Sequence, residues 1–177
     1  IIPAADLSEQ ISTAGMEASG TGNMKLAMNG ALTIGTLDGA NIEIRDAVGA
    51  DNIFFFGLTA EEVAIERAQG YYPIELVRSN AELAEALRQI GDGFFSPGDL
   101  RRFKPIVDAV TGDNEHFLCL ADYADYVDTQ ERVDELYRDR GSWTRKAILN
   151  TLSMGRFSSD RAVREYAERI WGLAPIG

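Results

Sequence analysis

Apolar residues gather in two short runs in the first third of the chain, separated by a segment with helical spacing. Residues 31–35 follow the turn-forming pair Asn29-Gly30, and residues 52–57 have an apolar centre. Short apolar runs bounded by turn residues are typical of buried strands. We expect a helix over residues 40–48 between them, and this order predicts a β-α-β unit with parallel strands. Ile1-Ile2 is interpreted as the end of a further strand.

Beyond residue 58 the apolar positions have the spacing of amphipathic helices. Thr59 with Glu62 forms a capping box, while Asn80 and Gly91 are the start and stop signals of another helix. The pair Ser96-Pro97 is interpreted as the start of the next helix. The chain therefore predicts an α/β fold with a partial Rossmann-like parallel sheet and several helices, without repeats or an internal domain boundary. The expected helices cover residues 59–69, 81–90, 96–110, 122–137, 142–152 and 159–171, the last two capped by Ser142 and Ser159.

Residues 17–25, with the sequence EASGTGNMK, combine small and polar residues with a lysine. Gly20 and Gly22 let the backbone turn tightly and bring its N–H groups close to a bound group. The N–H groups at the start of the helix expected here would attract a phosphate. Lys25, one turn further among apolar neighbours, would lose its proton more easily than a solvated lysine. An amine beside a phosphate site predicts an imine with a phosphorylated aldehyde, which points to pyridoxal phosphate.

Two common phosphate-binding loops do not fit these residues. A Walker loop has adjacent Gly and Lys followed by Ser or Thr, whereas Met24 precedes Lys25 and Leu26 follows it. The dinucleotide fingerprint has a third glycine at the position of Lys25. The alternative interpretation is a loop followed by an ordinary surface lysine that extends away from the core. The residue types alone leave both interpretations open.

The loop lies within a longer run of residues that matches one protein family. Residues 2–12 (IPAADLSEQIS) lead into it, and residues 29–41 (NGALTIGTLDGAN) follow. Together they resemble the pyridoxal-phosphate region of the glycogen and starch (α-1,4-glucan) phosphorylases. Later segments agree in order, with GFFSP at 93–97, ADY at 121–123, WTR at 143–145 and FSSDR at 157–161. The resemblance implies that residues 1–177 form the second half of the C-terminal, cofactor-binding domain of a glycosyltransferase B fold.

The same resemblance assigns roles to the residues of the loop. Lys25 would hold pyridoxal phosphate as a Schiff base, and Thr21 and Gly22 would bind the phosphate of this cofactor. The glucosyl unit would be met by a carboxylate that accepts from a sugar hydroxyl and by donating backbone N–H groups. The residues expected to line this sugar pocket are Glu17, Ala18, Ser19 and Gly20.

The implied activity is that of a glycosyltransferase in carbohydrate metabolism. Orthophosphate would cleave the terminal α-1,4 bond of glycogen, starch or maltodextrin, reversibly and with retention, and release α-glucose 1-phosphate. In this family the phosphate of the cofactor exchanges a proton with the substrate phosphate, unlike the two-carboxylate scheme of most glycosidases. Basic residues that contact both phosphates belong to the preceding part of the polypeptide in the family. We therefore expect this piece alone to be inactive and the full-length protein to be a homodimer.

Composition narrows the partners and the location. The 17 basic and 28 acidic residues give a net charge of −11, which repels nucleic acid and anionic membranes. We expect no signal peptide, and no apolar run approaches the roughly 20 residues of a membrane helix, so a cytoplasmic location is expected. His116 is the only histidine, so we expect it to be structural and expect no metal site. Cys119, between two leucines, permits no internal disulfide and is expected in the core.

Two other hypotheses stay open at this point. The first is a sugar-nucleotide glycosyltransferase of the same broad fold, in which the glycine loop holds a nucleotide diphosphate and Lys25 stays cationic. The second is a non-catalytic interaction module whose exposed half-sheet pairs with a partner or with itself.

Asp38-Gly39 is interpreted as a turn before the next helix, with a place in the sugar pocket as the alternative. Glu9 and Gln10 are interpreted as positions on a helix surface, near enough to the loop for a role in the site.

Overall fold

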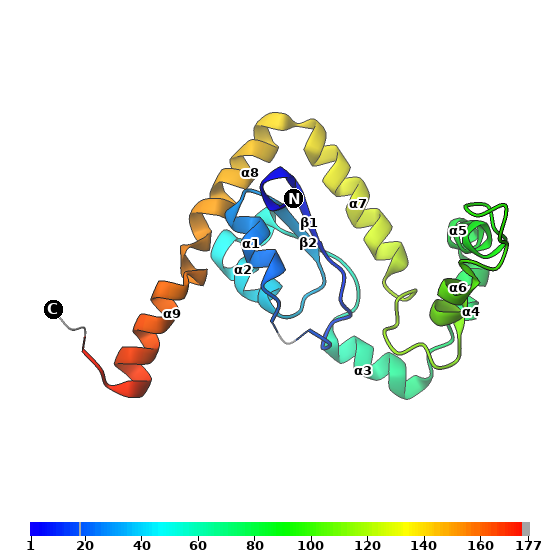
Figure 1. Ribbon diagram of the computed structural model, residues 1–177, viewed down its shortest axis with the longest axis horizontal. Helices are drawn as coiled ribbons and strands as arrows, with labels where there is room; N and C mark the ends of the chain where they lie inside the picture. The colour runs from blue at the N-terminus through cyan, green and yellow to red at the C-terminus, as the bar shows by residue number, and fades with distance from the viewer. Residues whose placement is uncertain (18, 175–177) are drawn as a thin grey trace.

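A computed structural model describes residues 1–17 and 19–174 of the chain. Its centre is a parallel sheet in which Leu7 pairs with Leu32 and Ile34 pairs with Phe54. Helix α2 (Ala40–Val48) connects the second strand to the third, so the predicted β-α-β unit is confirmed. The three strands lie in the order β1-β2-β3 and cover Leu7–Gln10, Leu32–Gly35 and Phe54–Phe55. Figure 1 labels β1 and β2 near the centre of the molecule.

Helices cover both faces of this sheet, and its central strand β2 is therefore buried along its whole length. On one face Leu32 and Ile34 pack against Val133 of α7 (Tyr123–Arg138) and Trp143 of α8 (Arg140–Ser153). The other face carries α1 (Gly22–Met28) and α2. The core cluster on this second face consists of Ala27, Ile44, Val48, Ile53 and Met154.

The predicted capping signals are confirmed for two helices. The Glu62 N–H donates to Thr59 Oγ1 at 3.3 Å and the Thr59 N–H donates to Glu62 Oε2 at 2.8 Å, which completes the capping box of α3 (Ala60–Gln69). Asn80 Oδ1 accepts from the Leu83 N–H at 3.0 Å and caps α5 (Ala81–Gly91). The other helices and short turns are α3 (Ala60–Gln69), α4 (Pro73–Ser79), α5 (Ala81–Gly91), α6 (Lys104–Thr111), α9 (Ser159–Tyr166), the 3-10 helices η1 (Ile2–Ala4), η2 (Ala50–Asn52) and η3 (Met154–Phe157), and the π-helical η4 (Ala167–Trp171).

The first strand is not where the sequence pattern places it. The expected strand end at Ile1-Ile2 is wrong, because Ile2–Ala4 form the 3-10 helix η1. Pro3 favours this turn, since its ring fixes φ and removes a backbone donor. The strand that starts the sheet is β1, which begins at Leu7.

The interpretation of Glu9 and Gln10 as helix-surface residues is also wrong, because both lie on β1. The strand is hard to detect because three of its four residues, Ser8, Glu9 and Gln10, are polar. The Glu9 carboxylate accepts hydrogen bonds from Tyr126 Oη at 2.7 Å and from Gln130 Nε2 at 3.0 Å. Polar side chains therefore attach this edge strand to α7.

Two helix starts differ from their predicted positions. The helix expected from Ser96-Pro97 begins at Lys104 instead, and the Ser96 hydroxyl donates to the Asp99 C=O at 2.8 Å within a turn. Helix α8 begins at Arg140 rather than after Ser142. Its cap is Asp139, whose Oδ1 accepts from the Ser142 N–H at 3.1 Å. The cap of α9 is Ser158 by position, one residue before the expected Ser159, and its side chain makes no capping bond.

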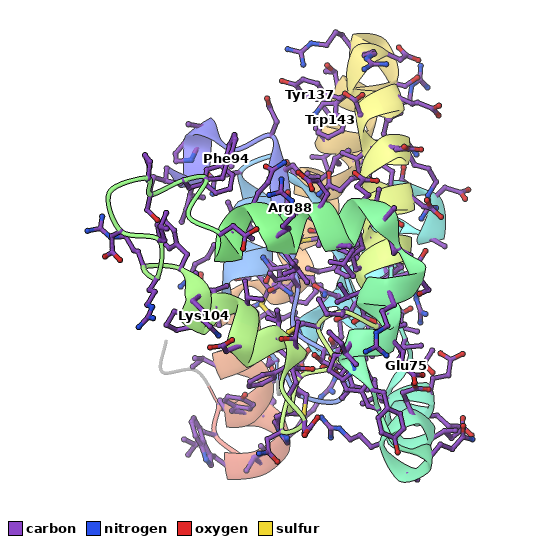
Figure 2. All side chains as sticks on the ribbon, turned by 90° about the vertical axis from the view of Figure 1, so that its right-hand side faces the viewer. Glu75, Arg88, Phe94, Lys104, Tyr137 and Trp143 are labelled. Carbon is purple, nitrogen blue, oxygen red and sulfur yellow. The ribbon has the colours of Figure 1, made fainter. Side chains whose placement is uncertain are left out.

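Two parts of the chain extend from this sheet-centred body (Figure 1). Helices α4, α5 and α6 form a helical arm over residues 73–111, which packs around Leu83 and Leu87. Figure 2 views this arm from outside, with Arg88 on α5, Lys104 at the start of α6 and Phe94 in the loop between these helices. On the opposite side of the body, α9 and η4 extend outward toward the C-terminus.

Candidate functional site at the carboxyl end of the sheet

The loop that contains the predicted site follows the carboxyl end of β1. Ligands of open parallel sheets bind at this end of the strands. The Thr36 N–H donates to the Gln10 C=O at 3.3 Å, and Thr36 Oγ1 donates to the Ser12 C=O at 2.6 Å. Gly15 and Gly20 have φ values of 85° and 78°, which glycine adopts readily. These bonds and turns hold the loop against the end of β2.

The turn after β2 makes further contacts with the loop. Asp38 Oδ2 accepts from the N–H groups of Met16 at 3.1 Å and Glu17 at 2.9 Å. Gly39 has a φ of 50°, and a Cβ at this position would lie 2.8 Å from the Ser19 carbonyl oxygen. A larger residue would therefore displace the loop. The prediction of a turn at Asp38-Gly39 is confirmed. The Asp38 side chain lies against the part of the loop that is predicted to bind a sugar.

A buried pair of amides attaches helix α1 to the same turn. Asn23 Nδ2 donates to Asn41 Oδ1 at 2.8 Å, and Asn41 Nδ2 donates to the Thr36 C=O at 3.0 Å. Asn23 and Asn41 are only 3% and 4% exposed. No sequence signal marks this pair, because residues 18 positions apart meet only in the fold. The amides fix the first turn of α1 relative to the end of β2.

Lys25 lies one turn into α1, and its side chain contacts Thr21, the residue before the helix. Its Nζ donates to Thr21 Oγ1 at 3.4 Å, and its N–H makes a 3.2 Å bond to the Thr21 C=O. Thr21 occupies the N-cap position but makes no capping bond through its side chain. Lys25 is exposed, so the described residues of this chain do not enclose the amine as the sequence predicts.

The start of α1 offers donors to a bound anion. The N–H groups of Gly22 and Asn23 precede the Lys25–Thr21 backbone bond and so have no partner within the helix. A Cβ at Gly22 would meet nothing within 4 Å, so the space over this residue is open. The Thr21 hydroxyl, these N–H groups and the Lys25 amine therefore form a donor set that fits a phosphate group beside an amine-bound aldehyde.

The residues predicted to face a sugar lie just before this helix start. The Ser19 N–H donates to Glu17 Oε1 at 3.4 Å, and both residues are exposed. A Cβ at Gly20 would lie 3.9 Å from the Glu17 carboxyl carbon, so Glu17 lies close to this turn. Ala18, predicted to line the same pocket, lies outside the described residues.

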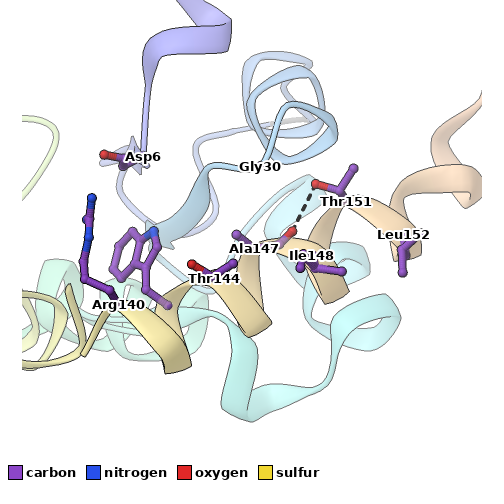
Figure 3. A pocket seen from close by; sticks show the side chains of 9 residues that line it. Asp6, Gly30, Arg140, Thr144, Ala147, Ile148, Thr151 and Leu152 are labelled. Atoms are coloured by element: carbon purple, nitrogen blue, oxygen red, sulfur yellow. Dashed lines mark hydrogen bonds between the residues drawn. The ribbon is translucent and has the colours of Figure 1, made fainter. Parts of the chain in front are cut away.

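A cavity of about 410 Å³ lies at the opposite end of the sheet. Its wall contains Asp6 before β1, Gly30 before β2 and the side of α8 that carries Thr144, Ile148 and Leu152 (Figure 3). Residues 17, 19–22 and 25 do not line this cavity. Most of the described residues of the predicted site are exposed, so the site is an open surface of this chain: Glu17, Ser19, Thr21, Gly22 and Lys25.

Two other residues singled out in the sequence lie near the start of the loop, where Thr13 Oγ1 donates to the Phe117 C=O, and not among residues 17–25. His116 is exposed, and its ring packs edge-on against Phe117 with centroids 5.2 Å apart. Cys119 is exposed, so its predicted place in the core is wrong. Its neighbours Leu118 and Leu120 are buried instead. Leu118 has a φ of 51°, so the chain turns at this residue.

Two further searches cover the described part of the chain. Residues 1–17 and 19–174 contain no cluster of three His, Cys, Asp or Glu side chains that could hold a metal ion. None of the helices in these ranges is both long and apolar enough to cross a membrane.

Comparison with known proteins gives the family of the chain. A sequence model described as "Carbohydrate phosphorylase" matches residues 1–173. The chain is 58% identical to glycogen phosphorylase of Synechocystis sp. and 51% identical to that of Haemophilus influenzae, each over 176 residues. It is 51% identical over 175 residues to the brain form of glycogen phosphorylase of Homo sapiens. Each comparison covers 99% of this chain but only 21% of the relative. On this match and these identities, the chain belongs to the carbohydrate phosphorylase family.

Proposed function

We propose that this chain is the cofactor-anchoring part of an α-1,4-glucan phosphorylase. The full-length protein would use orthophosphate to cleave the terminal bond of glycogen, starch or maltodextrin and release α-glucose 1-phosphate. The observation that carries the proposal is the 3.4 Å hydrogen bond between Lys25 Nζ and Thr21 Oγ1. It supports an amine beside the groups proposed to bind phosphate, in a segment that matches a carbohydrate phosphorylase model.

Three residues would hold pyridoxal 5'-phosphate. Lys25 anchors the aldehyde end, while the Thr21 hydroxyl and the Gly22 N–H orient the phosphate end. When bound, the cofactor supplies a phosphate group that can share a proton with orthophosphate. The protein groups thus fix the position of this phosphate relative to the glucan, which is the part of catalysis that depends on orientation.

The residues just before them would bind the glucosyl unit. Glu17 accepts a hydrogen bond from a sugar hydroxyl, and the N–H groups of Ser19 and Gly20 donate to sugar oxygens. We propose a role in the same sugar binding for Ala18. This division places sugar recognition on the loop and cofactor binding at the start of α1. The two are only one residue apart in sequence, which brings the terminal glucosyl unit next to the cofactor phosphate.

The remainder of the polypeptide would complete the domain and close the site. We propose the second half of the C-terminal domain of a glycosyltransferase B fold for residues 1–177. Two features support this: β1 and β3 are the edge strands of the described sheet, and the last helix exposes apolar side chains. Val163, Tyr166 and Ile170 are 56%, 49% and 69% exposed along α9 and η4. The isolated chain should then release no glucose 1-phosphate from maltodextrin, and measurable turnover would contradict this part of the proposal.

Borohydride reduction of the full-length protein tests the cofactor assignment. We expect a pyridoxyl adduct on the peptide that contains Lys25, found by mass spectrometry, and loss of the visible absorption of the cofactor. The Lys25→Ala protein should carry no adduct. A full-length protein without any adduct, which transfers glucosyl units from a sugar nucleotide, would instead support the alternative glycosyltransferase.

A further inference from the structure

The turn between β2 and α2 holds the two halves of the proposed site through separate contacts. Its Asp38 carboxylate and Ala40 N–H bind the sugar-facing loop, the latter through a 2.8 Å bond to the Ser19 C=O. Its Asn41 amide binds Asn23 in the first turn of α1, which carries the cofactor-anchoring lysine. One turn therefore supports both halves, but no single side chain in it contacts both.

The Asp38 contact determines how the loop presents Glu17. One carboxylate oxygen accepts from two successive N–H groups, those of Met16 and Glu17, at 3.1 and 2.9 Å. Such charge-assisted bonds restrain both peptide units and hence the direction in which the Glu17 side chain leaves the backbone. The two N–H groups are exposed, so water can replace the carboxylate when it is removed. The loop would then lose its orientation while the fold stays largely intact.

The cofactor half does not depend on this contact. The Asn23–Asn41 pair is buried and reaches the end of β2 through the 3.0 Å bond from Asn41 to the Thr36 C=O. Buried amide bonds are held by the surrounding packing and are not exchanged with water. Loss of the Asp38 carboxylate should therefore leave the position of Lys25 unchanged.

We propose that Asp38 is a positioning residue that sets the affinity of the site for the glucosyl unit, by aiming Glu17, without affecting cofactor binding. This inference rests on the proposed function. It assigns to Asp38 an effect on one half of the site only, and so predicts a separation that a general loss of structure would not produce.

The test uses the full-length protein with the substitution Asp38→Ala. We expect the KM for glucose 1-phosphate, in the direction of glucan synthesis, to rise about tenfold, as for the loss of one or two hydrogen bonds. The cofactor content, measured by pyridoxyl fluorescence after borohydride reduction, should equal that of the unchanged protein. Asp38→Asn keeps an acceptor oxygen in the same place and should restore the KM to within about twofold.

Two further variants serve as a matched control and as a second test. Asp46→Ala removes an exposed carboxylate of α2, 52% exposed, which contacts Arg45 and lies outside the site, and it should change neither KM nor cofactor content. Asp38→Glu keeps the charge but displaces the acceptor, so its KM should also rise, and it carries the test if Asp38→Ala does not fold. An unchanged KM in both Asp38→Ala and Asp38→Glu, or a KM that rises only together with loss of cofactor, would overturn the inference. A full-length protein without cofactor or phosphorolysis would instead refute the proposed function, whatever the Asp38 variants do.

Discussion

The sheet-centred body and the helical arm hold their side chains in different ways. In the body, Leu32, Ile34 and Ile44 are fully buried, and hydrogen bonds join distant segments, as from Asn150 Nδ2 to the Ala31 C=O at 2.6 Å. In the arm, the polar side-chain contacts are mostly local, such as the 2.6 Å pair of Arg88 and Glu85 on the exposed side of α5 (Figure 2).

This difference explains why the proposed site belongs to the body. A binding site needs groups from several segments in one fixed geometry, and long-range contacts fix segments relative to each other. The buried Asn23–Asn41 pair joins α1 to the turn after β2, and the exposed bonds to Asp38 join the loop to the same turn. In the arm, the ion pairs Arg88–Glu85 and Lys104–Asp108 each span one helical turn and join no distant segments.

The largest expected contrast is between two lysines, one in each region. In the full-length protein, Lys25→Ala should reduce phosphorolysis to the detection limit, because the cofactor loses its anchor. Lys104→Ala in the arm removes only a surface pair with Asp108, worth about 0–1 kcal/mol, and should leave activity unchanged. Assays of glucose 1-phosphate release check both variants. Equal activities would remove the distinction between the regions.

A second contrast compares two asparagines in the isolated chain. Asn41→Asp loses the donor to the Thr36 C=O and puts a charge beside it in a buried place, so the free energy of unfolding should fall by about 3 kcal/mol. Asn80→Asp in the arm keeps the cap of α5, since Asp caps a helix as well as Asn does. This substitution should change the free energy of unfolding by at most about 0.5 kcal/mol. Urea denaturation measures both. Similar losses for the two would show that the arm is held as rigidly as the body.

The smallest contrast is in the response to pH. Burial raises the pKa of Asp122, which accepts from the Leu58 N–H at 2.8 Å, with the nearby Asp125 adding to the rise. The Asp122 carboxyl therefore stays protonated to a higher pH in the folded chain than in the unfolded chain. Above the raised pKa, the ionised carboxylate destabilises the fold. Asp122→Asn should be more stable than the unchanged chain at pH 7, and this gap in Tm should shrink as the pH falls through the raised pKa. A gap that widens on acidification would contradict the assignment.

The arm should respond in the opposite direction. Hydrogen bonds from Arg88 and Gln89 lower the pKa of Glu85 to about 2, so its contribution is present above the ordinary value of 4.5 and is lost as the pH falls toward 2. Because Glu85 is exposed, the effect is expected to be slight. The matched variant Glu85→Gln should lose stability relative to the unchanged chain at pH 7 and none near pH 2, by the same measurement.

The sequence by itself determined the elements whose signals are local. The capping box of Thr59 and Glu62, the bounds of α2 and the buried strand β2 follow from neighbouring residues, because caps, turns and periodic apolar positions act within a few residues. The run of residues around Lys25 likewise indicated the family, since its glycines and lysine are adjacent in the chain.

Only the tertiary structure decided which residues support that loop. The polar strand β1, the exposure of Cys119, the Asn23–Asn41 pair and the two bonds accepted by Asp38 have no local signal. Each depends on a partner more than ten residues away or on which neighbour takes the buried position. Such choices are made by packing and by the pairing of buried polar groups, which act between segments that are distant in the chain and meet only once it has folded.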